Sequence, residues 1–194
     1  MKPSICFATN NPHKLKEIQE ILSAKFKIVS LNDIGCYEDI PETQPTIEGN
    51  SEQKARYVKD NFQLDCFADD TGLEVTILNN EPGVYSARYA GPQKNSKDNV
   101  ALLLENLEGI TDRSARFKTV ITLIYKGETI AFEGLIKGVI TDYPAGDNGF
   151  GYDPVFKPIG YNCTFAELSS EEKNKISHRA LAVQKLVAYL EYNI

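Results

Sequence analysis

The sequence predicts an α/β fold, in which a mixed β-sheet is flanked by helices, and three observations support this class. Short apolar runs of strand length alternate with segments whose apolar residues recur at helical spacing through the first half of the chain. A long β-rich stretch follows at residues 115–141, and the C-terminal segment is again helical in pattern. A length of 194 residues without linker, repeat or low-complexity stretch fits one domain, or two lobes that share a sheet.

Composition excludes several classes of function. The formal net charge of −6 argues against general binding to nucleic acid or to an anionic membrane. The four cysteines form no C-x-x-C pair, so we expect neither a zinc site nor disulfides, and we expect a reducing compartment. No apolar run reaches membrane-spanning length and the first residues lack the apolar region of a signal peptide, so we expect a cytoplasmic protein.

The N-terminal segment reads as a strand, a polar turn and a helix. Residues 5–8 form an apolar strand, and the apolar face of the helix follows as Leu15, Ile18, Ile21 and Leu22. Asn11 is a suitable N-cap and Pro12 a suitable first helical residue. Free N–H groups and the dipole at this helix start would attract an anion, and Lys14 adds a full charge. The alternative is an ordinary capped surface helix.

A second strand and a second helix follow an acidic loop. The strand is expected at residues 27–31 and the irregular loop at 32–45, where Glu38, Asp39 and Glu42 lie. Most acids in such a loop are solvated, although one of them could reach a metal ion. From Thr46 to about Phe62 the pattern is helical, with Ile47, Ala55, Val58 and Phe62 on one face and with Glu48, Asn50 and Lys54 near the start.

An acidic pair interrupts the next strand. The apolar run 64–68 is expected to end at Asp69 and Asp70, which are followed by Thr71 and a glycine. Adjacent carboxylates repel each other and are costly to bury without a cation or hydrogen-bond donors. Carboxylate oxygens at the rim of a sheet suit Mg²⁺, which combines a few carboxylates with water and phosphate oxygens. The alternative is a type I turn, because Asp-Thr-Gly is also turn chemistry.

The middle of the chain is expected to hold further sheet strands. A strand is predicted at residues 73–78, an irregular aromatic segment at 84–91, and a helix capped by Ser96. Residues 115–125 and 128–141 form a hairpin around Lys126-Gly127, and both faces of its first strand are apolar. A strand that is apolar on both faces is covered on both sides, so we place it inside the sheet or against a second subunit.

A glycine-rich loop at 142–154 carries aromatic rings and an acid. Phe150, Gly151, Tyr152 and Asp153 are consecutive, and glycines let a backbone approach a ligand closely. An aromatic ring on such a loop can stack on a planar base. The alternative is a flexible connection whose aromatic residues have no ligand.

The C-terminal helix begins with two cationic side chains. Ser177 is expected to cap it, and Leu181, Leu186 and Leu190 face inward. His178 and Arg179 then lie at the positive end of the helix dipole, which is unfavourable for cations. A bound acceptor atom or phosphate would offset this conflict, whereas the alternative is an ordinary surface pair.

Taken in order, these motifs resemble those of the inosine triphosphate pyrophosphatase family, also called Ham1-like proteins. The resemblance covers nearly the whole chain, and the ordered set is far more specific than any one motif. The matching segments are Thr9-Asn10-Asn11-Pro12-His13-Lys14, Thr46-Ile47-Glu48-Gly49-Asn50 with Lys54, Ala68-Asp69-Asp70-Thr71-Gly72, Pro82 to Tyr89, Gly149 to Pro154, and Ser177-His178-Arg179.

The resemblance implies a fold, an activity, a cofactor and a partner. The fold would be an elongated, twisted, mixed sheet flanked by helices, as one domain over residues 1–194 with two lobes and an active-site cleft between them. The activity would be hydrolysis of deaminated purine nucleoside triphosphates (ITP, dITP, XTP) to the monophosphate and pyrophosphate. Such enzymes use Mg²⁺, and the family implies a homodimer, for which the apolar hairpin and residues 84–89 are candidate contacts.

The resemblance also implies roles for individual residues. Asp70 would be the proton acceptor and a metal ligand, with Asp69 beside it and Glu42 as a further, direct or indirect, ligand. The triphosphate would lie on the turn from Thr9 to Lys14, and the base on the loop from Phe150 to Asp153, with Phe150 stacking. The implied substrate-binding residues are Thr9, Asn10, Asn11, Lys14, Lys54, Thr71, Phe150, Gly151, Tyr152, Asp153, Lys173, His178 and Arg179.

Discrimination between bases would depend on the purine 6-position. Hypoxanthine and xanthine carry a carbonyl there, whereas adenine carries an amino group. A donor such as Arg179, or a backbone N–H group, would pair with the carbonyl and conflict with the amino group. A site built around such a hydrogen bond rejects the analogue by roughly 10⁴-fold or more.

Two other functions are compatible with the sequence. One is a Maf-like nucleotide pyrophosphatase that acts on pyrimidine or modified nucleotides, from which only the Phe150 and Arg179 motifs separate this chain. The other is a non-catalytic nucleotide-binding module, which would bind without turnover. A haloacid-dehalogenase phosphatase is disfavoured, because Asp69-Asp70-Thr71 lacks the D-x-D spacing.

Overall fold

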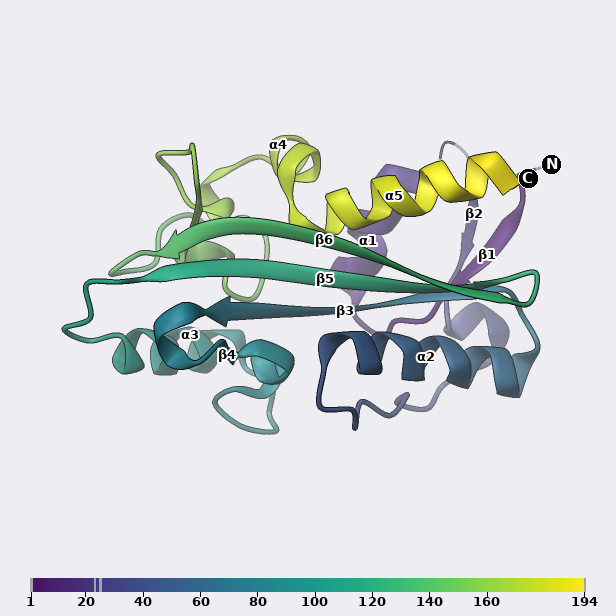
Figure 1. Cartoon of the computed structure of the whole chain (residues 1–194), viewed down its shortest axis with the longest axis horizontal. Helices are drawn as coiled ribbons and strands as arrows, with labels where there is room; N and C mark the ends of the chain where they lie inside the picture. Colours follow the sequence, from purple (N-terminus) through teal and green to yellow (C-terminus); the bar gives the residue numbers. More distant parts are fainter. Residues whose placement is uncertain (1, 23, 25, 194) are drawn as a thin grey trace. The chain divides into compact units, whose positions relative to one another are not determined.

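The computed structural model describes residues 2–22, 24 and 26–193 (Figure 1). The chain divides into two compact units. Unit 1 comprises Met1–Asp70, Thr119–Gly134 and Arg179–Ile194, and unit 2 comprises Thr71–Lys118 and Leu135–His178. None of the described helices combines the length and the apolar character that a membrane crossing requires.

The strands form one mixed sheet, as predicted. Their order is β2-β1-β3-β5-β6-β7, and the short β4 pairs with β3. β1 is parallel to β2 and to β3, whereas the β3–β4 and β6–β7 pairs are antiparallel. The bounds are β1 Ser4–Phe7, β2 Lys27–Val29, β3 Cys66–Val75, β4 Glu81–Pro82, β5 Ser114–Tyr125, β6 Glu128–Ile140 and β7 Phe156–Pro158. The interior position predicted for β5 is confirmed, because it lies between β3 and β6.

In unit 1, helices cover both faces of the strands. α1 (Pro12–Leu22) and α5 (His178–Asn193) pack on one face, and α2 (Ile47–Phe62) packs on the other (Figure 1). Side chains alternate along a strand, so successive residues of β1 and β3 enter different clusters. Phe7 and Phe67 stack in the cluster with α1 and α5, whereas Ala8 and Ala68 lie in the cluster with α2.

Strand β3 continues through the acidic pair, which corrects the prediction that a strand ends at residue 68. One strand runs from Cys66 to Val75, and residues 76–78, which we predicted to be extended, form a 3₁₀ turn. The strand can continue because Asp69 and Asp70 point to opposite faces, where separate cations compensate each of them. The acids therefore lie in the middle of a buried strand and not at the rim of the sheet.

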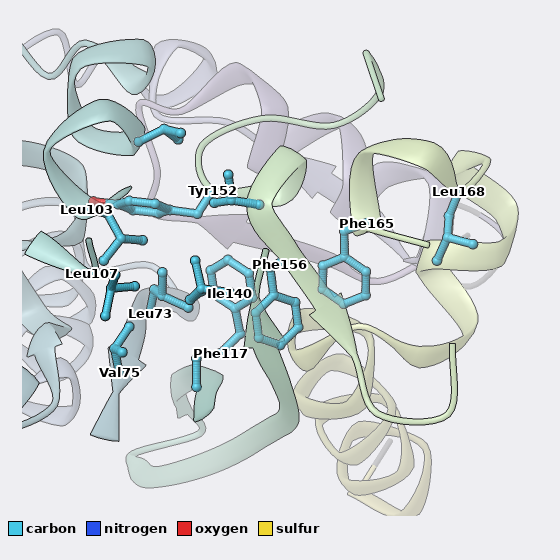
Figure 2. Close-up of a cluster of buried hydrophobic side chains, with 13 residues drawn as sticks. Leu73, Val75, Leu103, Leu107, Phe117, Ile140, Tyr152, Phe156, Phe165 and Leu168 are labelled. Carbon is cyan, nitrogen blue, oxygen red and sulfur yellow. The ribbon is translucent and has the colours of Figure 1, made fainter. Parts of the chain in front are cut away.

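Unit 2 has its own apolar core, which is rich in aromatic rings (Figure 2). Leu73 and Val75 of β3 pack with Leu103 and Leu107 at the end of α3 (Ser96–Asn106). On the other side of this cluster the rings of Phe117 and Phe156 meet edge to face with centroids 4.6 Å apart. Tyr152, Phe165 and Leu168 also belong to the cluster, which fixes the loops that contain them.

Several local predictions differ from the structure. Asn95, not Ser96, caps α3, because its side chain accepts hydrogen bonds from the N–H groups of Lys97 and Asp98. The segment predicted to be irregular contains a 3₁₀ helix at Gly83–Arg88, fastened by the Ser86 hydroxyl, which donates to Gly83 O at 2.6 Å. The sequence analysis did not predict strands β4 and β7, the 3₁₀ turns at 32–34, 153–155 and 165–167, or helix α4 (Ser170–Ile176). Ser177 ends α4 directly before α5 begins.

Candidate active site

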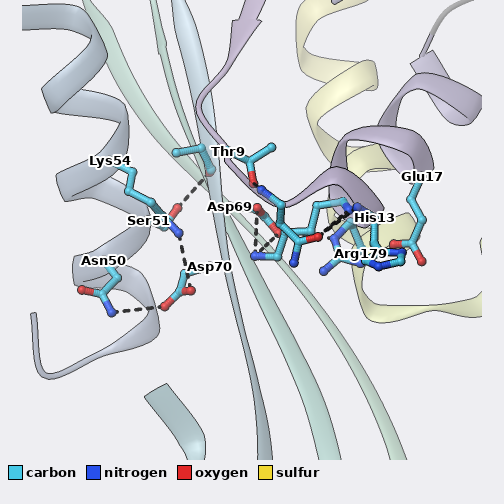
Figure 3. A network of polar contacts seen from close by, with 12 residues as sticks. Thr9, His13, Glu17, Asn50, Ser51, Lys54, Asp69, Asp70 and Arg179 are labelled. Atoms are coloured by element: carbon cyan, nitrogen blue, oxygen red, sulfur yellow. Dashed lines mark hydrogen bonds and ion pairs between the residues drawn. The ribbon is translucent and has the colours of Figure 1, made fainter. Parts of the chain in front are cut away.

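The predicted site residues fall into two groups, one in each unit, and each group is organised locally. The unit 1 group surrounds the acidic pair of β3 (Figure 3). Asp69 shares the strand face of Phe67, which α1 and α5 cover, and Asp70 shares the face of Ala68, which α2 covers. The alternation of the strand thus gives two neighbouring acids different partners.

Asp69 is fully buried and is neutralised by two cations. The Lys14 ammonium group lies 3.1 Å from Oδ1 and 3.0 Å from Oδ2, and Arg179 Nε lies 3.3 Å from Oδ2. The Arg179 guanidinium also forms an ion pair with Glu17 of α1. Burial alone would raise the pKa of Asp69, but Lys14 and Arg179 outweigh it and hold that pKa well below its usual range. Asp69 is therefore an ionised carboxylate that organises the cations around it.

Asp70 has a different environment on the opposite face. Asn50 Nδ2 lies 3.4 Å from Oδ2, and the Lys54 ammonium group lies 3.6 Å from Oδ1. Burial raises the pKa of Asp70 above its usual value, although Lys54 and Lys14 act against this shift. A carboxylate with a raised proton affinity beside a cation is the kind of group that can accept a proton from water.

Helix α2 is fastened to the sheet by Ser51, a residue that the sequence analysis missed. Its hydroxyl donates to Ala68 O at 3.0 Å, lies 2.9 Å from Thr122 Oγ1 and accepts the Thr122 N–H at 2.9 Å. This contact lies between Asn50 and Lys54, which are one helical turn apart and therefore face the same way. Ser51 thereby holds both partners of Asp70 in register with β3.

The turn before α1 has the predicted strand–turn–helix geometry, and Asn11 is confirmed as its cap. Asn11 Oδ1 accepts the N–H groups of His13 at 2.9 Å and Lys14 at 3.3 Å. These N–H groups are therefore already engaged, which differs from our expectation of a first turn that offers free donors. Asn10 donates to Asp39 Oδ1 at 3.2 Å and so ties the acidic loop to this turn.

In unit 2, Asp153 organises the aromatic loop. Its Oδ2 accepts the Phe150 N–H at 2.8 Å and lies 2.8 Å from Lys173 Nζ. The Lys173 ammonium group lies 5.0 Å from the centroid of the Phe150 ring. This arrangement requires a glycine at position 149. The φ of Gly149 is +76°, and a Cβ atom there would overlap Asp153 Oδ2. Asp153 and Lys173 therefore hold Phe150 in place.

Other predicted residues of unit 2 have structural partners. Tyr152 lies in the apolar core, and its hydroxyl donates to Ser86 O at 2.8 Å (Figure 2). The His178 ring is buried and stacks on Phe117 with centroids 4.5 Å apart. Thr71 is half-buried in β3, and Gly151 has a φ of +64° with open space where a Cβ would be. Tyr152 and His178 thus support the fold around the loop.

The donor set for a metal ion is smaller than predicted. Among the described residues, no three His, Cys, Asp or Glu side chains gather closely enough to hold an ion. Asp69 faces away from Asp70, towards Lys14 and Arg179. Glu42 and Asp70, however, both lie beside one cation, the Lys54 ammonium group, at 2.6 Å and 3.6 Å. Two carboxylates that share one positive charge fit an ion such as Mg²⁺, which takes its other ligands from water and phosphate.

Glu17 belongs to the unit 1 group but has no place among the sequence-predicted residues. It lies on α1 three positions after Lys14, so both side chains share one helix face. This spacing is the signal that could have identified it. The partner on α5 could not be found in this way, because Arg179 is 162 residues away in the sequence.

Known proteins are similar to this chain in sequence and in fold. A model of the Ham1 family matches residues 5–189. The chain belongs to the Ham1 family. A relative from Flavobacterium johnsoniae, named dITP/XTP pyrophosphatase, is 57% identical, and the match covers 96% of this chain and 97% of the relative. A relative of the same name from Porphyromonas gingivalis is 54% identical, and the match covers 96% of both chains. The Ham1 protein structure from Staphylococcus aureus has a TM-score of 0.90 and 39% identity, and covers 98% of this chain and 100% of its own.

Proposed function

We propose that this member of the Ham1 family hydrolyses deaminated purine nucleoside triphosphates (ITP, dITP, XTP) to the nucleoside monophosphate and pyrophosphate. The proposal agrees with the activity in the names of its relatives. The structural observation that carries it is the environment of Asp70. This buried carboxylate is held by Asn50 and lies beside a cation and a second acid, as a water-activating group requires.

The reaction breaks the anhydride between the α- and β-phosphates. Asp70 orients a water molecule and accepts its proton while the water oxygen forms a bond to the α-phosphorus and pyrophosphate leaves. Lys14 and Lys54 supply positive charge to the phosphate chain. Asp69 is a poor proton acceptor, because Lys14 and Arg179 hold its pKa well below the usual range. It acts by fixing the position of Lys14.

We also propose that Glu42 and Asp70 hold Mg²⁺. The ion would neutralise charge on the triphosphate and on the leaving pyrophosphate. The shared position of Lys54 between these two acids supports this donor set. Asp69 is left out of the set, because it faces the other side of β3.

The aromatic loop of unit 2 is the candidate for base recognition. Its Phe150 ring is held by Asp153 and Lys173, which suits a rigid stacking surface. Arg179 is a poorer candidate than we expected for the donor that binds the purine 6-carbonyl, because its guanidinium group is buried between Asp69 and Glu17. We therefore propose a backbone N–H group as the donor that distinguishes hypoxanthine from adenine.

Pyrophosphate release from a panel of triphosphates tests the function. We expect turnover of ITP, dITP and XTP with Mg²⁺, little turnover of ATP, and none after chelation. Preferred hydrolysis of pyrimidine triphosphates would favour the Maf-like alternative. Tight binding of ITP without pyrophosphate release would show a binding module, and either result would contradict the proposal.

We further propose a homodimer in the cytoplasm. The first strand of the hairpin, which is one candidate contact, is used within the fold, because the apolar side chains of β5 are buried. The other candidate, residues 84–89, fits better, since Tyr85 is 54% exposed. The four scattered cysteines, which form no C-x-x-C pair, support a reducing compartment.

A further inference from the structure

The Lys54 ammonium group occupies a position that a bound cation would take. It lies 2.6 Å from Glu42 Oε1 and 3.6 Å from Asp70 Oδ1, and the Lys54 and Asp70 side chains are almost completely buried. Asn50 contacts the other oxygen of Asp70. Lys54 is therefore the group that brings positive charge between these two carboxylates.

This arrangement is stable only while some cation is present. Two carboxylates that face one point repel each other, and the repulsion is strong where burial excludes water. The Lys54 ammonium group supplies that cation, because it contacts Glu42 and lies beside Asp70. A second cation at the same oxygens would be repelled by the ammonium group. Lysine is suited to leave, because its charge lies at the end of a flexible stem.

We propose that Lys54 is an internal counter-ion, which fills the metal position between Glu42 and Asp70 in the nucleotide-free protein and leaves it when a divalent ion binds. The inference rests on the proposed function, because it takes these two acids as the metal ligands. Its consequence is that binding of Mg²⁺ alone is weakened by Lys54. The displaced ammonium group is then free to pair with a phosphate of the nucleotide.

Calorimetric titration of Mg²⁺ alone into the nucleotide-free protein tests this exchange. In Lys54→Met no ammonium group has to be displaced, so we expect Mg²⁺ to bind at least about tenfold more tightly than to the wild type. Lys54→Arg keeps the charge and should bind as weakly as the wild type. Equal affinities in Lys54→Met and the wild type would overturn the proposal.

Lys14→Met is the matched control, because it removes the same charge from the other side of β3. Lys14 pairs with Asp69, not with Glu42 or Asp70. We expect its loss to change the affinity for Mg²⁺ much less than the loss of Lys54. A tightening as large as that in Lys54→Met would show that only net charge matters, and would contradict a specific exchange.

A folding measurement covers the case in which Lys54→Met does not fold without metal. Circular dichroism should then show that added Mg²⁺ restores the fold, because the ion replaces the missing counter-charge. Failure of Mg²⁺ to restore it, while Lys54→Arg folds normally, would overturn the proposal. Pyrophosphate release by the wild type is measured separately, so a failed exchange and a failed assignment of the activity give different results.

Discussion

The two neighbouring aspartates of β3 have different chemistry because a strand points successive side chains to opposite faces. Asp69 meets Lys14 and Arg179 and stays ionised. Asp70 meets a neutral amide and one lysine, and burial raises its pKa. Environments that separate the proton affinities of paired acids are typical of sites that use one acid as a base and the other as a fixed charge.

Asp70→Asn should remove activity and leave the fold intact. An amide keeps the size of the side chain but cannot accept the proton of water, so we expect kcat/KM for ITP to fall by about 10²–10⁴-fold. Pyrophosphate release measures the loss, and thermal unfolding shows whether the fold persists. Asp60→Asn, at an exposed position of α2, is the control and should behave as the wild type. Near-wild-type turnover in Asp70→Asn would refute its role as the base.

Asp69→Asn should destabilise the protein at neutral pH. The substitution leaves Lys14 and Arg179 with less negative charge beside them, which costs about 3 kcal/mol of unfolding free energy. The pKa of Asp69 is lowered in the fold, so its stabilising contribution is present above the unfolded pKa and is lost as pH falls through the folded pKa. Denaturant unfolding should therefore show a constant difference from the wild type above about pH 5 that shrinks below about pH 4.

The exposed acid Asp112 provides the control for this measurement. Asp112→Asn should show no comparable loss at neutral pH, because its side chain is exposed and its hydrogen bond from the Ser114 N–H is local. A stability difference for Asp69→Asn that stays unchanged down to pH 2 would contradict the assigned ionisation.

The loop that carries Phe150 depends on one glycine and one buried ion pair. Asp153 can reach the Phe150 N–H only because Gly149 has no side chain in its path. Lys173 of α4 then joins this acid, so that the helix, the loop and the ring form one local unit. In unit 1, too, a single polar side chain joins several elements, because Ser51 connects α2 to β3 and β5.

Gly149→Ala should impair nucleotide binding more than stability. The added methyl group displaces Asp153 and with it the Phe150 N–H, so we expect KM for ITP to rise about tenfold or more. Steady-state kinetics measure this change. Gly160→Ala is the control, because Gly160 also has a positive φ, +87°, but has open space around its Cβ position. It should carry a similar backbone cost of about 1 kcal/mol with KM unchanged. Equal KM values for the two variants would contradict the role of Gly149.

Taken as a whole, the chain forms two units, each of which has apolar clusters of its own. β3, β5 and β6 each contribute residues to both units, so that the division falls within strands and not at a linker. For this reason residues next to each other in sequence, such as Asp70 and Thr71, belong to different units. The single domain with a cleft that we expected from the sequence stays a prediction.

The oligomeric state is tested by light scattering after size-exclusion chromatography. We expect a dimer at micromolar concentration, and we expect Tyr85→Glu to shift it towards monomer because a charge replaces an exposed ring in the candidate contact. Tyr192→Glu is the control, since Tyr192 is 90% exposed but lies outside that segment. A wild-type monomer, or equal behaviour of the two variants, would contradict the proposed contact.

Patterns along the chain predicted the elements with strong periodicity. The apolar faces of α1 and α2, the cap at Asn11 and the interior position of β5 were expected and are confirmed. The errors lie where a short segment has no period of its own. β7 has only three residues, and it pairs with β6, from which a long loop separates it in the sequence. Such a segment becomes a strand only when a neighbouring strand supplies its hydrogen bonds.

The sequence by itself determined the family, the order of the motifs and the identity of the chemical groups, because these are properties of residue type and spacing. Only the tertiary structure decided which cation pairs with which carboxylate. Lys14 and Arg179 reach Asp69 from 55 and 110 residues away in the sequence, while Lys54 reaches Asp70 from the other face. Those pairings set the charge of each acid, since a buried carboxylate takes its proton affinity from the cations that packing brings to it.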